Sequence, residues 1–270
     1  MIPQLQFILG LALGAFIGIL AWRAGALSPS GGWAAAIIGG LIFGLGGWSW
    51  AVLLLAFFIS SSALSRLFAH QKARVNEKFA KGSRRDWAQV AANGGLGALL
   101  AIWHALYPDQ GWVWAAFAGA MAAVNADTWA TELGVFSPTA PRLITTGKPV
   151  EPGTSGGITP LGYLAVLSGS AWIALLAAGF SPAMGRWILA IVITLAGAVG
   201  SSCDSLLGAT RQAIYDCPAC LKETERFPLH SCGTPTRWKR GWRWLNNDWV
   251  NFLCSLAGAT TAGLLWSLLR

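Results

Sequence analysis

Charged side chains are scarce in this sequence. Of its 270 residues only 11% are charged and 54% are hydrophobic, whereas an ordinary soluble domain is about 25% charged. The charges are missing from several runs of roughly 17 to 25 residues, the length that a helix needs to cross a bilayer. One soluble core cannot absorb so many such runs. The composition therefore excludes an ordinary soluble domain and predicts an all-α, polytopic bundle of membrane helices.

Eight spans are predicted, and we expect them to form a single integral membrane domain over residues 1–270. They cover about 4–22, 31–47, 48–65, 87–106, 111–134, 158–178, 184–206 and 247–268. The second and third are separated only by Gly46 and Gly47, so they could instead form one kinked or re-entrant element. The first four residues lack the basic region of a signal peptide, so we interpret the first run as a retained span.

Basic residues are nearly absent from alternate loops. Of the 19 Lys and Arg residues, all but Arg186 and Arg270 fall in the loops around Arg23 and at residues 66–85, 134–157 and 208–246. The positive-inside rule places these loops in the cytoplasm and both termini outside. The same distribution explains the net charge of +8 as a topology signal, so we expect no nucleic-acid partner.

Acidic residues are rarer still, with 11 in the whole chain. Asp127, Glu132 and Asp204 nevertheless lie inside or at the end of apolar spans, where a charge is costly. Asp248 begins the last span at the same membrane level. Carboxylates gathered at one level suit a hard cation such as Mg²⁺ that is shared with substrate phosphates. The alternative is that they form salt bridges or hydrogen bonds between helices.

Polar residues recur every three or four positions in three spans, which places them on single helical faces. These faces are Ser201, Asp204, Ser205 and Gln212 in the seventh span, Asn247, Asp248 and Asn251 in the last, and Asn125, Thr128 and Glu132 in the fifth. Asp127 points about 200° away from Asn125, at about 100° per residue. Either the fifth helix unwinds before Gly134, or Asp127 and Glu132 have different roles.

A glycine-rich loop at residues 147–158 directly precedes the sixth span. Its glycines permit backbone N–H groups to turn inward as an anion nest beside the positive end of a helix. We expect this nest to bind phosphate, with positive charge added by two flanking residues. The residues concerned are Gly153, Thr154, Ser155, Gly156 and Gly157, flanked by Arg142 and Lys148. The loop is not a Walker A motif, which ends in Gly-Lys-Ser/Thr, and a simple connector remains the alternative.

The long loop at residues 208–246 contains four soft ligands. They are Cys217, Cys220, His230 and Cys232, and the closely spaced first pair is typical of a tetrahedral structural Zn²⁺ site. A cytoplasmic loop is in a reducing compartment, which disfavours disulfides. Zinc is therefore the preferred interpretation.

Five segments together resemble a membrane family long known only as a domain of unknown function, which includes plant phytyl-phosphate kinase. They are residues 125–134, 142–147, 153–157, 204–208 and 244–252. The glycine-rich loop and the helix that carries Asp204 are more distantly similar to those of CDP-diacylglycerol synthases and dolichol kinases. The resemblance extends over nearly the whole chain.

The resemblance implies a kinase that moves the terminal phosphate of a nucleoside triphosphate, with CTP favoured, onto an isoprenyl monophosphate such as phytyl or geranylgeranyl phosphate. By matching position, Asp127, Glu132 and Asp204 would be the catalytic, Mg²⁺-binding residues. Residues 153–157 would bind phosphates, and Asn247, Asp248 and Asn251 would complete the pocket. The chemical alternatives are a polyprenol kinase or a lipid cytidylyltransferase. A lipid or ion transporter is a further alternative, because intramembrane acids also mark ion pathways, and a homodimer is left open.

Overall fold

The computed structural model describes residues 3–69, 78 and 84–269, and within these the chain forms eight long helices. They are α1 (Pro3–Arg23), α2 (Pro29–Gly46), α3 (Trp48–Leu67), α4 (Trp87–Leu106), α5 (Gly111–Leu133), α6 (Pro160–Gly179), α7 (Arg186–Thr210) and α8 (Asn247–Leu268). Each predicted span corresponds to a helix whose ends lie within four residues of the predicted ones. The second and third are separate helices, because Gly47 has a positive φ of 82° and turns the chain between them.

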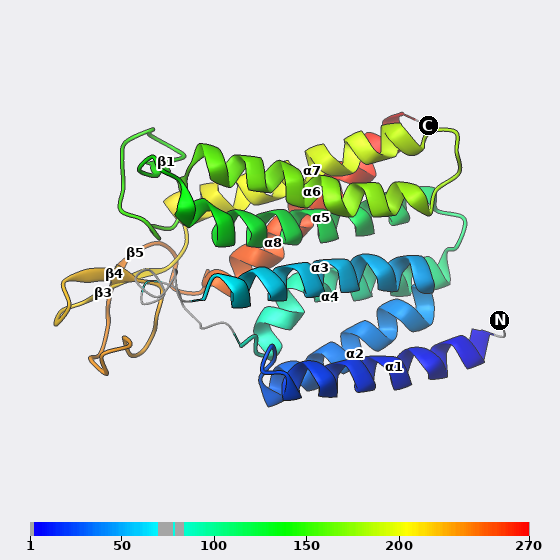
Figure 1. The fold of residues 1–270 in the computed structure, drawn as a ribbon, viewed down its shortest axis with the longest axis horizontal. Helices are drawn as coiled ribbons and strands as arrows, with labels where there is room; N and C mark the ends of the chain where they lie inside the picture. The colour runs from blue at the N-terminus through cyan, green and yellow to red at the C-terminus, as the bar shows by residue number, and fades with distance from the viewer. Residues whose placement is uncertain (1–2, 70–77, 79–83, 270) are drawn as a thin grey trace.

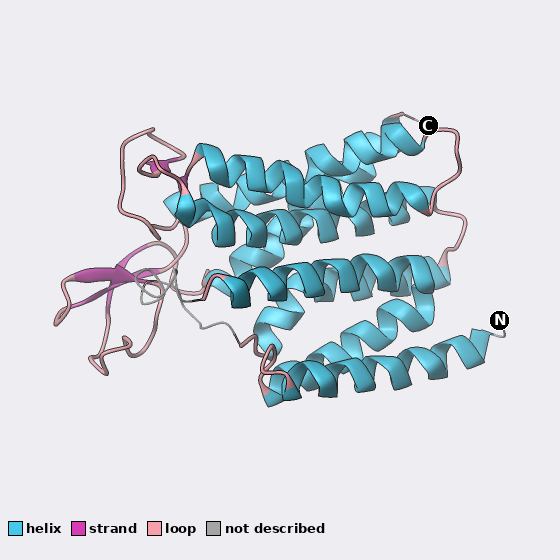
Figure 2. Cartoon of the chain, in the orientation of Figure 1, coloured by secondary structure: helices cyan, strands magenta, loops and turns pink. Residues whose placement is uncertain are grey.

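The long loops and all described strands lie at one end of the bundle, opposite the start of α1 and the end of α8 (Figure 1). The strands form two small antiparallel sheets (Figure 2). β1 (Arg142–Leu143) pairs with β2 (Gly157–Ile158), while β3 (Ile214–Cys217) lies between β4 (Lys222–Thr224) and β5 (Arg237–Arg240). The molecule is therefore helical in its body, as predicted, with β-structure confined to two loops.

Four helices begin at this loop-bearing end, and each begins with a side-chain cap. Ser28 and Thr159 cap α2 and α6 just before a proline, which needs no hydrogen-bond acceptor in the first turn. Asp86 and Asn246 cap α4 and α8. The positive ends of four helix dipoles consequently point toward the loops.

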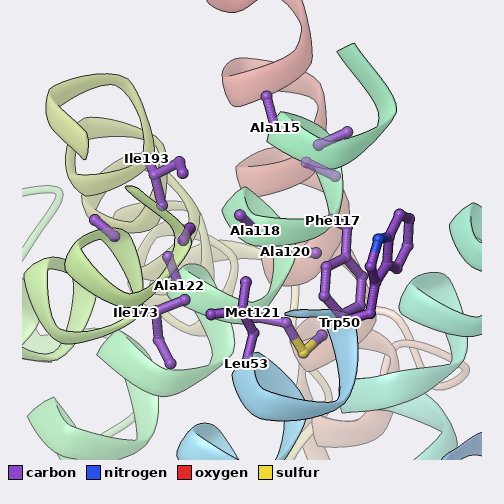
Figure 3. Close-up of a cluster of buried hydrophobic side chains, with 14 of the residues drawn as sticks. Trp50, Leu53, Ala115, Phe117, Ala118, Ala120, Met121, Ala122, Ile173 and Ile193 are labelled. Atoms are coloured by element: carbon purple, nitrogen blue, oxygen red, sulfur yellow. The ribbon is translucent and has the colours of Figure 1, made fainter. Parts of the chain in front are cut away.

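The helix α5 is the centre of the bundle, because it packs against α3, α4, α6, α7 and α8. All of its residues from 115 to 126 are buried. Phe117 stacks on Trp50 of α3 with ring centroids 4.2 Å apart, and Met121 lies beside this pair (Figure 3). Gly119 meets Gly258 of α8 so closely that an added Cβ would press on the backbone. Such small-residue contacts let membrane helices approach without a gap.

By length and composition, six of the described helices can cross a membrane: α1, α2, α3, α6, α7 and α8. The other two, α4 and α5, do not meet the same criteria of length and hydropathy. α5 can carry Asp127 and Glu132 because its neighbours, rather than lipid, surround it. The innermost helix of the bundle thus carries two acids at the end that faces the loops.

Candidate active site

A polar cavity of about 440 Å³ opens at the loop-bearing end of the bundle. Its walls come from that end of α3 to α8, from the glycine-rich loop and from the segment after β4. Asp127 and Asp204 each lie six residues before the end of their helix, a depth of about 9 Å at 1.5 Å per residue. The cavity is therefore a pocket at one membrane boundary.

Four carboxyl groups line this cavity, from Asp127, Glu132, Asp204 and Glu225. α5 remains helical through Leu133, so the prediction that it could unwind is wrong and its two acids face different walls. Asp127 accepts a hydrogen bond of 3.4 Å from Ser201 Oγ on α7. Glu132 accepts one of 2.7 Å from Ser65 Oγ on α3. The two acids of α5 therefore line one cavity but contact different neighbouring helices.

Asp204 lies one turn after Ser201 on α7, and it lines the same cavity as Asp127, which Ser201 contacts. Within the described part of the chain, Asp204 Oδ2 is buried and accepts no hydrogen bond. A buried carboxylate oxygen without a donor is costly unless a cation neutralises it. This pair is the part of the cavity that best suits a divalent cation.

Glu225 is the acid that the sequence analysis missed. It follows β4, and its backbone N–H donates to the carbonyl of Lys78 at 2.9 Å. Its side chain accepts a hydrogen bond of 2.6 Å from Ser155 Oγ in the glycine-rich loop. No local pattern marks it, because only the fold of the long loop brings it into the cavity.

The glycine-rich loop is held against the end of α7. Gly156 has a φ of 83°, and an added Cβ there would meet Ala209 and the carbonyl of Ser205. The N–H groups of Thr154 and Gly157 are used inside the loop, donating to the carbonyls of Glu151 and Thr154. Those of Gly153, Ser155 and Gly156 donate to no described residue. Three amides, rather than all five, thus remain to bind an anion.

Arg85 is the only basic side chain among the described residues that line the cavity. Its guanidinium lies over the rings of Phe57 and Phe58, at 5.5 and 5.8 Å from their centroids. Burial lowers the pKa of Arg85 to about 10, and the charge of Glu132 opposes this shift. Arg85 therefore remains a cation at neutral pH. The sequence analysis treated it only as part of a basic loop, most of which lies outside the described residues.

Four of the predicted binding residues do not line the cavity. Asn125 is fully buried and joins helices, accepting from Ser60 Oγ and donating to the carbonyl of Gly169. Arg142 is exposed and donates to the carbonyl of Gly147 at 2.8 Å, and Lys148 is exposed on the same turn. Asp248 is half-buried at the start of α8 and is not among the residues that line the cavity. Arg142 does lie beside the glycine-rich loop, since its strand pairs with Gly157–Ile158, but its side chain does not line the cavity.

The other predicted residues do line the cavity. They are Asp127, Thr128, Glu132, Gly153, Thr154, Ser155, Gly156, Gly157, Ser201, Asp204, Ser205, Gln212, Asn247 and Asn251. The polar faces predicted on α7 and α8 are thus brought together with the glycine-rich loop. Their binding roles remain predictions.

The four soft ligands of the long loop also cluster, as predicted. The ligand atoms of Cys217, Cys220, His230 and Cys232 all lie within 4.8 Å of one another. Cys217 Sγ is 3.6 Å from Cys232 Sγ, and His230 Nδ1 is 3.2 Å from Cys232 Sγ. A tetrahedral zinc with Zn–S bonds of about 2.3 Å holds its sulfur ligands about 3.8 Å apart. Hydrogen bonds with Thr234 and His230 lower the pKa of Cys232 to about 5, whereas those with Cys232 and Cys217 raise the pKa of Cys220 to about 11.

Together these features define a polytopic membrane protein with an acidic, glycine-bordered pocket at one end of its helix bundle. A family model described as integral membrane protein DUF92 matches residues 12–259. The chain belongs to this family, which confirms the resemblance found in the sequence.

Relatives occur in plants, archaea and cyanobacteria. The chain is 35% identical to Protein PGR of Arabidopsis thaliana over 232 residues, which cover 78% of this chain and 80% of that protein. It is 35% identical to the uncharacterized membrane protein MJ0933 of Methanocaldococcus jannaschii over 175 residues, 64% of this chain and 69% of the relative. It is 26% identical to the uncharacterized membrane protein sll0875 of Synechocystis over 238 residues, 87% and 81% of the two chains. No solved structure matches the chain.

Proposed function

We propose that this protein is a kinase that transfers the terminal phosphate of a nucleoside triphosphate, with CTP favoured, to an isoprenyl monophosphate. The observation that carries the proposal is the meeting of four carboxyl groups and a glycine-rich loop in one cavity at the membrane boundary. A nucleotide is soluble and a prenyl phosphate is lipid-borne, so their reaction requires a site at such a boundary.

The charge of the cavity supports a metal-dependent reaction. Among the described lining residues, four carboxyl groups face a single guanidinium, so an unaccompanied polyphosphate would be repelled. Mg²⁺, held by Asp127, Asp204 and the neighbouring acids, would neutralise both sets of oxygens and the charge that develops during phosphoryl transfer. Ser201 and the amides of the glycine-rich loop would orient the bound groups.

The chemistry asks little of the protein beyond positioning. A non-bridging oxygen of the prenyl phosphate attacks the γ-phosphorus of the nucleotide. As this bond forms, the bond between the γ-phosphorus and the β,γ-bridging oxygen breaks, and the nucleoside diphosphate leaves. The attacking oxygen is already anionic, so no strong general base is required. Orientation of the two phosphates and neutralisation of their charge are the main contributions to the rate.

The membrane orientation is part of the proposal. Of the Lys and Arg residues that the structure describes, all but Arg186 lie at the loop-bearing end, which supports a cytoplasmic cavity and external termini. Nucleoside triphosphates are cytoplasmic, so this orientation suits the reaction. A transporter is less well supported, because such proteins place their charged groups near the midplane.

The test is transfer of label from [γ-³²P]CTP to geranylgeranyl or phytyl phosphate by purified protein with Mg²⁺, with extraction of the lipid product. A labelled prenyl diphosphate is the expected product. Label on a free prenol would indicate a polyprenol kinase, and release of pyrophosphate would indicate a cytidylyltransferase. Absence of transfer from CTP, GTP, ATP and UTP would reject the proposal.

A further inference from the structure

A second, apolar cavity lies beside the polar one and is separate from the site described so far. It has a volume of about 120 Å³ and is lined by side chains of α1, α2, α3 and α4. Leu13, Ile38, Leu54 and Phe58 are typical of its walls. Among its described lining residues, only Arg85, Gln89 and Asn93 carry a charge or an amide side chain. The cavity is therefore an apolar slot with a polar border on one side.

This polar border is shared by the two cavities, since Arg85, Gln89 and Asn93 line both of them. Gln89 and Asn93 lie four residues apart on α4, and Arg85 lies just before this helix. The three residues form the polar boundary between the two cavities. On one side of this boundary the lining side chains are carboxylates and hydroxyls, and on the other side they are mainly leucines and phenylalanines. That is the polarity profile of a lipid with a phosphate head.

The packing of the helices leaves room for such a slot. α1 packs on α2, and α2 packs on α4, whereas α3 packs on α5, α2 and α6 and has few contacts with α1 or α4. The slot lies between α3 and these first helices. Arg85 is fixed at its mouth, because its backbone exchanges hydrogen bonds of 3.1 and 2.9 Å with Ala26 and Ser28 at the turn before α2. Gly31 permits this approach, since an added Cβ there would press on the carbonyl of Arg85.

We infer that this slot binds the hydrocarbon tail of a single-chain lipid phosphate and that Arg85 holds its phosphate at the junction of the two cavities. The inference rests on the proposed function and names the acceptor site within it. Its position places the lipid phosphate in the polar cavity beside Glu132 and opposite the glycine-rich loop. One narrow slot accommodates one chain, which favours a prenyl phosphate over a phospholipid with two acyl chains.

The first test fills the slot. Gly39 lines it on α2, and an added Cβ would have only Leu54 Cδ2 near it, at 3.8 Å. Gly39→Leu should therefore fold but occupy the tail site. We expect kcat/KM for geranylgeranyl phosphate to fall by roughly tenfold, the effect of withdrawing about two methylene groups from an apolar site. The value for dimethylallyl phosphate, whose short tail does not reach the slot, should be unchanged.

Gly95→Leu is the matched control. Gly95 lies on α4, lines neither cavity, and an added Cβ would have no neighbour within 4 Å. It should keep the wild-type preference for the long substrate. If both variants lose the same activity on both substrates, or if Gly39→Leu behaves like the wild type, the tail site is wrong.

A binding measurement separates this inference from the proposed reaction. A geranylgeranyl phosphate analogue with a diazirine in its tail should photolabel peptides of α2 and α3, and unlabelled geranylgeranyl phosphate should compete. This result would support the tail site even if no nucleotide gave a product, in which case only the proposed kinase reaction would fail. Labelling confined to α5 to α8, which do not line the slot, or equal competition by phosphatidic acid, would overturn the inference.

Discussion

Ser155 in the glycine-rich loop donates a hydrogen bond of 2.6 Å to Glu225, which lies 70 residues further along the chain. The contact joins the loop before α6 to the segment between β4 and β5. It also brings a fourth carboxyl group to the three from the membrane helices. The long loop is thus part of the candidate site rather than a separate appendage.

This contact predicts that Glu225 contributes to transfer. Glu225→Gln should lower kcat by about 10- to 100-fold, because it removes one of the charges that would hold the metal and orient the glycine-rich loop. Glu223→Gln is the matched control, since Glu223 pairs on the surface with Lys239 at 3.0 Å and does not line the cavity. The label-transfer assay measures both. Equal activity of the two variants would remove Glu225 from the site.

The Cys and His cluster predicts a link between zinc and activity. Glu225 lies between Cys220 and His230 in the sequence, so a metal bound by both would fix the ends of the segment that carries it. Cys220→Ser should reduce the bound zinc, measured by mass spectrometry of the purified protein, and should lower transfer by about tenfold or more. Glu225→Gln should lose activity but keep its zinc. Full activity in a zinc-free protein would contradict the link.

The acids of α5 and α7 in the cavity predict that a substitution there abolishes phosphoryl transfer without unfolding the protein. Asp204→Asn should reduce kcat by about 100-fold or more, because it withdraws a charge that the transition state requires. Asp109→Asn, in the exposed turn between α4 and α5 at the opposite end, should retain wild-type activity. Thermal unfolding should show that both variants are folded. Substantial activity in Asp204→Asn would argue against this carboxyl group as a metal ligand.

The close packing of Gly156 predicts different results for two glycine substitutions. Gly156→Ala and Gly147→Ala both place an L side chain at positive φ, of 83° and 68°, which costs about 1 to 2 kcal/mol. Only Gly156→Ala also forces a Cβ into α7, whereas that of Gly147 would meet nothing. Gly156→Ala should therefore show the larger drop in melting temperature and a raised KM for the nucleotide. Identical effects would show that the loop does not depend on contact with α7.

The eight helices could be predicted because length and hydropathy are local properties of a membrane span. The acids on α5 and α7 could be predicted for the same reason, since a charge is conspicuous in an apolar run. Helical spacing also indicated that Asp127 does not share a helical face with Glu132, and in the structure the two contact α7 and α3 respectively.

The remaining residues depend on contacts far apart in the sequence. Arg142 is near the glycine-rich loop in sequence, yet its guanidinium is used by the carbonyl of Gly147. Asn125 has the spacing of a pocket residue, but α3 and α6 surround it. Glu225 and Arg85 enter the cavity only because a long loop folds over it and the start of α4 is clamped to the turn before α2. The helical periodicity of the sequence therefore could not predict that Glu225 and Arg85 line the cavity.

The most direct test of the account is the affinity for CTP, measured by equilibrium dialysis with and without Mg²⁺. The account predicts that the wild-type protein binds CTP only with Mg²⁺, and that the double variant Asp127→Asn, Asp204→Asn loses this metal-dependent binding. Binding of CTP that is equally tight in EDTA, or that survives in the double variant with Mg²⁺, would contradict the claim that these acids hold phosphate through a cation.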